Sequence, residues 1–254
     1  MPTKDDHTQR KSLPARLGQW IAPLALILSM AVGGFQIYDN TVLRKQNEIA
    51  SSRSSLADFV RKITEINGSL VSIQHSTSNA MAMKSLTQVL NLEKLSLLGQ
   101  ADSLITRQPD IASYASFMAL SLEHINWGNV KRARNYVQSA YSLANTSVER
   151  VESRRVEAIT WFVPSTIQDV ERAQELFSDA IRNAKEIEII GGALTGNVYR
   201  DWIASEAADG NCGRAKGLLK ALETEMKEQY NGFRIWKTVM DEIFAATGGT
   251  SCAL

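Results

Sequence analysis

Three segments in the second half of the chain share one spacing of residue types. Each begins with a polar or turn-forming residue and has a small residue five positions later. A bulky residue follows four positions on, and an apolar residue three positions after that. The segments begin at Gly128, Gln168 and Gly210, and their small residues are Ala133, Ala173 and Ala215. Such recurrence is typical of helical repeat arrays, in which each unit buries its apolar face against the next. We therefore expect these segments to be the second helices of successive helical hairpins.

The pattern resembles the tetratricopeptide-repeat family, in which a small residue lets the two helices of a repeat cross closely. The first copy has a residue of suitable type at each place where the family usually has Trp, Leu, Gly and Tyr, namely Phe117, Leu120, Ser121 and His124. The third copy matches with Tyr199, Trp202 and Ile203 but departs at Glu206, and the middle copy has Pro164 near the end of its first helix. The small residues are 40 and 42 positions apart, whereas the family repeats about every 34 residues. The resemblance covers residues 109–225, and a four-helix bundle or an unrelated α-solenoid is the alternative.

The resemblance implies a protein that binds peptides or partner helices on the concave face made by its first helices. The positions that match this face are Ala115, Met118, Leu122 and Ile125 in the first copy and Asn197 and Arg200 in the third. Because the first set is apolar, we expect a hydrophobic segment of a partner protein to bind there. Alternatively, some of these positions pack against the C-terminal helix or against a helix expected at residues 80–106.

An uncharged stretch of 22 residues runs from Leu17 to Tyr38. As a helix it would be roughly 33 Å long, which is about the thickness of the hydrocarbon core of a bilayer. Trp20 and Tyr38 stand near its ends, where aromatic rings favour the headgroup region. We expect a basic tail at residues 1–16 and a transmembrane helix at residues 17–38. The alternative is a cleaved signal peptide, because Ser29 and Ala31 place small residues at the two positions that a signal peptidase recognises.

The charges flanking this stretch favour one orientation. Four Lys or Arg residues precede it and three follow it closely, so we expect the N-terminus in the cytoplasm and the rest outside it, as in a periplasmic domain on a bacterial inner membrane. Ala25, Ser29 and Gly33 recur every four residues, a spacing that lets two membrane helices approach closely. In an oxidising compartment Cys212 and Cys252 could form a disulfide, whereas free thiols are expected in the cytosol.

Residues 39–79 carry apolar residues at intervals of seven. The first set is Val42, Ile49, Leu56, Ile63 and Leu70, and a second set joins it at Phe59, Ile66 and Ile73. Both sets fall on one stripe of a helix. This segment is either a coiled-coil stalk, which would make the chain a homodimer through span and stalk, or an amphipathic helix that packs on its own domain. We expect that domain at residues 80–254, closed by a capping helix at residues 231–246.

No residue pattern for catalysis, cofactor binding or metal binding is present in the sequence. The three histidines, His7, His75 and His124, lack metal-ligand spacing. The glycines at residues 191–196 fit neither the P-loop, which ends in Lys-Ser or Lys-Thr, nor the GxGxxG pattern, and we expect a loop there. The 28 basic and 27 acidic residues give a net charge of +1 with no basic stripe, which argues against nucleic-acid binding.

We therefore expect an all-α protein with an N-terminal transmembrane helix, an amphipathic stalk helix and a short tetratricopeptide-like α-solenoid. The expected function is that of a membrane-anchored, non-enzymatic adaptor for a partner protein. One alternative is a structural or accessory subunit of a multi-protein membrane complex, inserted through its span and stalk. Another is an enzyme of unrecognised type, which would need a pocket lined by clustered polar side chains.

Overall fold

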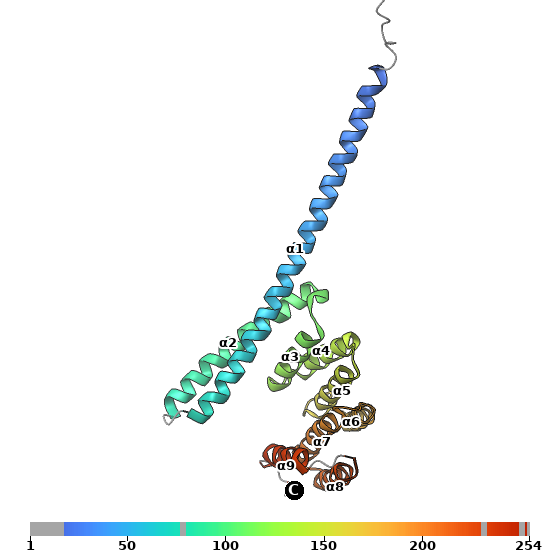
Figure 1. The fold of residues 1–254 in the computed structure, drawn as a ribbon. Helices are drawn as coiled ribbons and strands as arrows, with labels where there is room; N and C mark the ends of the chain where they lie inside the picture. The colour runs from blue at the N-terminus through green and yellow to red at the C-terminus, as the bar shows by residue number, and fades with distance from the viewer. Residues whose placement is uncertain (1–17, 77–79, 230–232, 249–251, 253–254) are drawn as a thin grey trace, which may run out of the picture. The chain divides into compact units, whose positions relative to one another are not determined.

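The computed structural model describes residues 18–76, 80–229, 233–248 and 252, with side chains at 41–73, 81–227, 238–245, 247, 248 and 252. Over these residues the chain forms nine α-helices, one 3₁₀ helix and no strand, which confirms the all-α class (Figure 1). The elements are α1 (Gly18–Ser76), α2 (Ala80–Arg107), η1 (Pro109–Ile111), α3 (Tyr114–Asn126), α4 (Val130–Leu143), α5 (Ser147–Phe162), α6 (Val170–Lys185), α7 (Gly191–Ala208), α8 (Cys212–Gln229) and α9 (Phe233–Thr247).

The chain divides into two units, Met1–Ser52 and Arg53–Leu254. In the first unit the backbone is helical from Gly18, and the described side chains at 41–52 are mostly exposed. The predicted span at residues 17–38, including Ala25, Ser29 and Gly33, lies outside the residues whose side chains are described. Within the described part of the chain, no helix combines the length and the apolar character needed to cross a membrane.

In the second unit, α3 to α8 form three successive helical hairpins: α3–α4, α5–α6 and α7–α8. We call the first helix of each hairpin its A helix and the second its B helix. Each B helix packs on the next A helix, as α4 does on α5 and α6 on α7, and the A helices contact one another in order. This packing joins the hairpins into one continuous array.

The turns and helix starts of the array follow from local sequence. Gly128 and Gly210 have φ angles of 71° and 82°, so the glycines of the two Gly-Asn pairs adopt the left-handed conformation between an A helix and its B helix. Side chains cap the helices that follow at Asn129, Thr146 and Asp169, each accepting a hydrogen bond from a backbone N–H in the first turn.

Four fully buried alanines, three on B helices and one on α2, precede or mark the contacts between hairpins. Ala133, Ala173 and Ala215 are fully buried, and so is Ala101 of α2, which the sequence pattern did not single out. Ala101, Ala133 and Ala173 are each followed by a polar residue, and the side chain of that residue bonds to the last turn of the next A helix. These inter-hairpin links are Asp102 Oδ1 to His124 Nε2 at 3.0 Å, Arg134 Nη2 to the Thr160 carbonyl at 3.1 Å, and Gln174 Nε2 to Glu206 Oε1 at 2.8 Å. Helix α2 therefore makes the contact of a B helix that precedes α3.

The heptad stripe of the predicted stalk is covered within the chain from Leu56 onward. Leu56, Ile63, Ile66 and Ile73 are all buried, and so are Leu97, Leu98 and Ile105 of α2. The amphipathic-helix interpretation accounts for this burial without a second chain. Arg53 Nη2 also donates to the Asp110 carbonyl at 3.3 Å. Residues 53–76 of the predicted stalk thus belong to the second unit.

A buried polar junction ties α1, α2 and α3 together. Lys94 Nζ lies 3.1 Å from Glu123 Oε2 and donates to Asn67 Oδ1 at 2.9 Å, while Asn67 Nδ2 donates to Glu123 Oε1 at 2.6 Å. The Lys94 and Glu123 side chains are only 8% and 5% exposed. Each charge is thus compensated by the other and by the amide, which is the condition under which an ion pair can be buried.

Helix α9 packs on α7. A Cβ atom on Gly196 would lie 3.0 Å from Val239 Cγ2, so glycine there permits the close approach of α9. The loop expected at residues 191–196 is wrong, because these residues form the first turns of α7. Their glycines serve helix packing, since a Cβ on Gly191 would also collide with the Ala184 carbonyl.

Candidate functional site

The predicted partner-binding residues of α3 differ in accessibility. Ala115 is exposed, Leu122 is 40% exposed and Ile125 is half-buried. Met118 is buried at 9%, because α5 packs against α3 there and Ser153 Oγ lies 3.8 Å from its sulfur. Met118 therefore packs against α5, and Leu122 is the largest accessible apolar residue of the set.

The predicted residues of α7 are engaged by neighbouring helices. Asn197 and Arg200 are half-buried. Arg200 Nη1 pairs with Glu242 Oε2 of α9 at 2.6 Å, and Arg200 Nε pairs with Asp201 Oδ1 at 2.8 Å. Burial alone would lower the pKa of Arg200, but these carboxylates outweigh it and raise the pKa. Asp201 also pairs with Arg155 of α5, so Arg200 belongs to a chain of ion pairs that joins α5, α7 and α9.

The two predicted sets do not meet, because α5 packs between α3 and α7. What lies between the C-terminal ends of α5 and α7 is a hollow of about 170 Å³, which we call the α5–α7 hollow. It is lined by Ile159, Phe162, Val163, Pro164, Ser205, Ala208 and Asp209. Five of these seven side chains are apolar. The hollow is an apolar, concave feature of the A helices.

Two amide side chains fix the rim of this hollow. Gln168 Nε2 donates to the Phe162 carbonyl at 3.1 Å and to Asp209 Oδ1 at 3.3 Å, which holds the α5–α6 loop against the end of α7. Asn211 Nδ2 donates to Asp209 Oδ2 at 3.1 Å. In the described part of the chain no ion pair includes Asp209, so its carboxylate is positioned at the rim by neutral donors.

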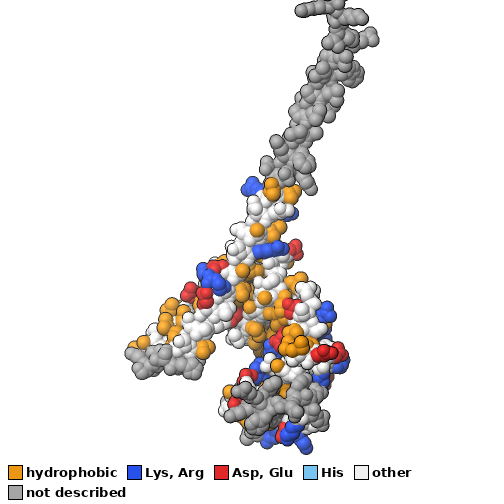
Figure 2. All heavy atoms as spheres, in the orientation of Figure 1, with side chains coloured by type: hydrophobic (Ala, Val, Ile, Leu, Met, Phe, Trp, Pro, Cys, Tyr) orange, Lys and Arg blue, Asp and Glu red, His pale blue; other side chains and the backbone are white. Residues whose placement is uncertain are grey.

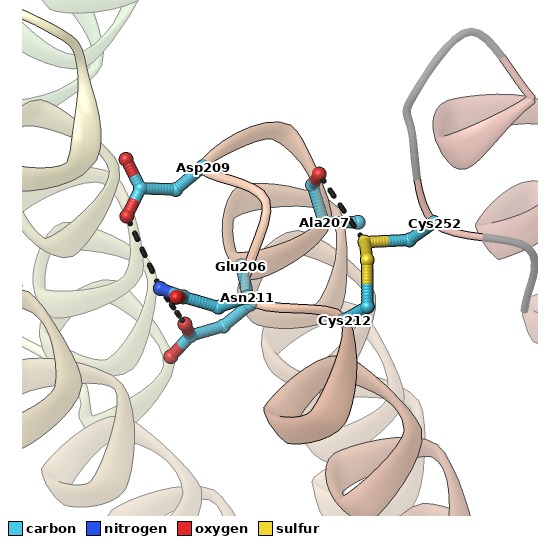
Figure 3. Close-up of a disulfide and its surroundings, with 6 residues drawn as sticks. All are labelled: Glu206, Ala207, Asp209, Asn211, Cys212 and Cys252. Atoms are coloured by element: carbon cyan, nitrogen blue, oxygen red, sulfur yellow. Dashed lines mark hydrogen bonds between the residues drawn. A yellow bond between two sulfur atoms is a disulfide. The ribbon is translucent and has the colours of Figure 1, made fainter.

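Asn211 also connects the hollow to a buried carboxylate, Glu206. Figure 3 shows Asn211 between Asp209 and Glu206, and its Nδ2 donates to Glu206 Oε2 at 3.0 Å. Trp202 Nε1 and Gln174 Nε2 donate to the other Glu206 oxygen at 2.9 and 2.8 Å, and Arg214 Nε lies 3.3 Å from that oxygen. The fully buried Glu206 is therefore satisfied from α6, α7, α8 and the α7–α8 turn, which explains its departure from the repeat pattern.

A disulfide lies on the other side of the same turn. Cys212, the first residue of α8, is bonded to Cys252, the pair for which the sequence suggested a bridge, with Cα atoms 5.1 Å apart (Figure 3). Cys252 is buried, and its sulfur lies 3.6 Å from the Ala207 carbonyl of α7. The bridge thus attaches the C-terminal segment to the third hairpin.

A broad polar cavity of about 490 Å³ lies over α6 and α8. Its carboxylates, Glu171, Glu175 and Asp179, follow one face of α6, and Asp179 pairs with Arg182 at 3.0 Å. Among the described residues no group of His, Cys, Asp and Glu could hold a metal ion. This arrangement is that of a solvated helix face.

His124 lies in a second polar cluster, in the interior of the first hairpin. Its Nε2 is 3.0 Å from Asp102 Oδ1, which also accepts from the Tyr136 hydroxyl at 2.7 Å, and Arg132 Nε lies 3.3 Å from Asp102 Oδ2. Burial would raise the pKa of Asp102, but the hydrogen bonds from His124 and Tyr136 outweigh it and lower the pKa. Burial raises the pKa of Tyr136, and hydrogen bonding to Asp102 adds to the effect. The cluster holds α2, α3 and α4 together.

Helix α2 presents a second apolar surface, which is visible in Figure 2. Leu86, Val89, Leu92 and Leu95 are each between 46% and 61% exposed. The sequence analysis did not single out this surface, because a spacing of three residues drifts around the helix rather than forming one stripe.

Comparison with protein-family models, with curated proteins and with solved structures gave no match. The fold and site define an all-α protein of the helical-hairpin type with an apolar hollow between two of its A helices. The resemblance to the tetratricopeptide family stays a prediction based on the sequence pattern.

Proposed function

We propose that this chain is a non-enzymatic, membrane-anchored adaptor that binds a partner protein on the A-helix face of its hairpin array. The observation that carries the proposal is the α5–α7 hollow, an apolar concavity of the size of one large side chain with a fixed polar rim. Leu122 and Ala115 of α3 extend the accessible surface on the same set of helices. The uncharged stretch at residues 17–38 supplies the anchor in this proposal.

Site-specific photocrosslinking in native membranes tests this function. A photoreactive amino acid is placed at Leu122 or at Ala208, both exposed on A helices, and at the control position Ser178, exposed on the B helix α6. We expect one protein to be crosslinked from both A-helix positions, and no crosslink to it from Ser178. We also expect Leu122→Glu, which leaves the buried core unchanged, to reduce the yield of this crosslink.

The alternative outcomes point to other functions. Equal crosslinking from Ser178, or no crosslink from either A-helix position in a chain that is folded and inserted, would contradict binding on this face. Recovery of one stoichiometric membrane complex that is unaffected by Leu122→Glu would favour a structural subunit, held through its span.

A further inference from the structure

The size of the α5–α7 hollow restricts what part of a partner can enter it. Its volume of about 170 Å³ is close to that of engineered apolar cavities of about 150 Å³, which hold one benzene molecule. One branched aliphatic side chain or one phenyl ring would fill it, whereas a helix or strand would not. The hollow therefore has the dimensions of a pocket for a single anchoring side chain.

The charge at the rim restricts what can stand next to that side chain. Asp209 is exposed, and both of its oxygens are held by neutral amides, those of Gln168 and Asn211. The neighbouring carboxylate of Glu206 is already paired with Arg214 and fully buried. Arg134 of α4 donates to the Ile167 carbonyl of the α5–α6 loop at 3.4 Å, and its guanidinium is itself buried, 3.2 Å from the centre of the Trp161 ring.

We propose that the hollow binds one branched apolar side chain of the partner, presented beside a positively charged group that pairs with Asp209. A Leu or Ile next to a Lys or Arg in a peptide segment has this chemistry. The inference rests on the proposed function, because it describes the partner of that same face. The fixed carboxylate favours a cation over a neutral group, and it repels an anion.

Three small probes that share an isobutyl group separate the apolar contribution from the charge. They are isopentylammonium, isopentanol and isovalerate, which are cationic, neutral and anionic. Each is titrated into the full-length chain in detergent, with ¹³C-labelled Ala, Ile and Val methyl groups observed by NMR. We expect shifts at Ala208, Ile159 and Val163, with the cation binding roughly two- to fivefold more tightly than the alcohol, the range of an exposed ion pair, and the anion most weakly.

Two variants make the test specific. Asp209→Asn removes the charge and keeps an amide oxygen for Gln168. We therefore expect the variant to bind the cation and the alcohol with equal affinity, and its affinity for the alcohol to equal that of the parent chain. Ala208→Trp fills the hollow from the exposed end of α7, so we expect all three probes to lose their shifts at the remaining reporters, Ile159 and Val163. Circular dichroism and thermal unfolding of both variants should match those of the parent chain.

The inference is overturned if cation and alcohol bind equally to the parent chain, if the preference survives Asp209→Asn, or if no probe shifts these methyl groups. Its failure is distinguishable from failure of the proposed function. Crosslinking from Leu122 and Ala208 without probe binding would retain the adaptor and reject this pocket. Probe binding in the expected order, cation before alcohol before anion, without a crosslink to any partner in native membranes would support the preference of the hollow and reject the adaptor function.

Discussion

Gln174 of α6 donates a hydrogen bond to Glu206 of α7 over 2.8 Å, and the acceptor carboxylate is fully buried. Arg134 and Asp102 make the corresponding contacts with the next A helices, at Thr160 and His124. The polar residue that follows a buried alanine thus connects each hairpin to the next, so that the hairpins are joined by hydrogen bonds as well as by apolar packing.

Glu206→Ala should be strongly destabilising. The substitution leaves the donors of Gln174, Trp202 and Asn211 without the fully buried carboxylate that accepts from them, and we expect the free energy of unfolding to fall by about 3 kcal/mol. Urea unfolding followed by circular dichroism measures the change. Glu223→Ala, which removes an exposed pair with Lys227, is the control and should cost less than about 1 kcal/mol. Equal losses in the two variants would show that the buried network contributes nothing of its own.

Replacing both cysteines by serine should lower stability through the unfolded state. The bridge spans 40 residues, and closing a loop of this length stabilises the folded state by about 4 kcal/mol in the chain-entropy estimate. Urea unfolding of the parent chain and of the Cys212→Ser, Cys252→Ser double variant measures this difference. Added reductant should destabilise the parent chain and leave the double variant unchanged. An equal response of both proteins to reductant would contradict the prediction.

Two glycine-to-alanine substitutions should have opposite effects. At Gly217 of α8 a Cβ meets nothing within 4 Å, so Gly217→Ala should stabilise the protein by about 0.5–1 kcal/mol through helix propensity. At Gly196 the new methyl group approaches Val239 and Met226, so Gly196→Ala should lose this gain and increase amide hydrogen exchange in α9. Thermal unfolding and hydrogen-exchange mass spectrometry test the pair. Stabilisation by both substitutions would mean that α9 does not pack closely on α7.

Lys94→Met should destabilise the chain more than the double substitution Lys94→Met, Glu123→Leu. The single change leaves the Glu123 carboxylate buried without its cation, which costs about 3–5 kcal/mol. The double change removes both charges, and packing of the new apolar side chains should restore much of the loss. Free energies of unfolding for both single variants and the double variant complete the cycle. Additive losses would show that the two residues are not coupled.

The stability of the protein should fall between pH 10 and pH 12 in part because of Tyr199. Burial, together with the nearby Glu225 carboxylate, raises the pKa of Tyr199 to about 12, from the usual tyrosine value of 10.0. The folded state therefore holds this proton more tightly than the unfolded state. The resulting stabilisation is complete below pH 10 and is lost as the pH rises through 12. Unfolding free energies from pH 8 to 12 should decline less steeply for Tyr199→Phe than for the parent chain, and parallel declines would argue against the shift.

The alanine spacing predicted the hairpin array because a small residue marks where two helices cross closely. Ala133, Ala173 and Ala215 are fully buried in the B helices, as that interpretation requires. Ala101 was missed because it precedes Ala133 by only 32 residues, outside the interval of the other three. The polar residues that follow Ala101, Ala133 and Ala173 would have been a usable signal for this fourth position.

The α5–α7 hollow could not be read from the sequence. Its rim depends on Gln168 and Asp209, which are 41 residues apart and meet only through the packing of a loop on the end of α7. The accessibility of the predicted concave-face residues depends on tertiary packing in the same way. Positions such as Met118 and Arg200 are accessible on an isolated helix, but α5 covers the first and Glu242 of α9 engages the second.

The bridge between Cys212 and Cys252 changes how the chain would respond to tension. A pull applied beyond Cys252 would pass through the sulfur atoms to the first residue of α8, at the α7–α8 turn. The segment between the two cysteines, including α9, would carry none of this load. About 140 Å of extended chain would stay out of reach of the force until the bond is reduced. The end of the array is thus protected from peeling.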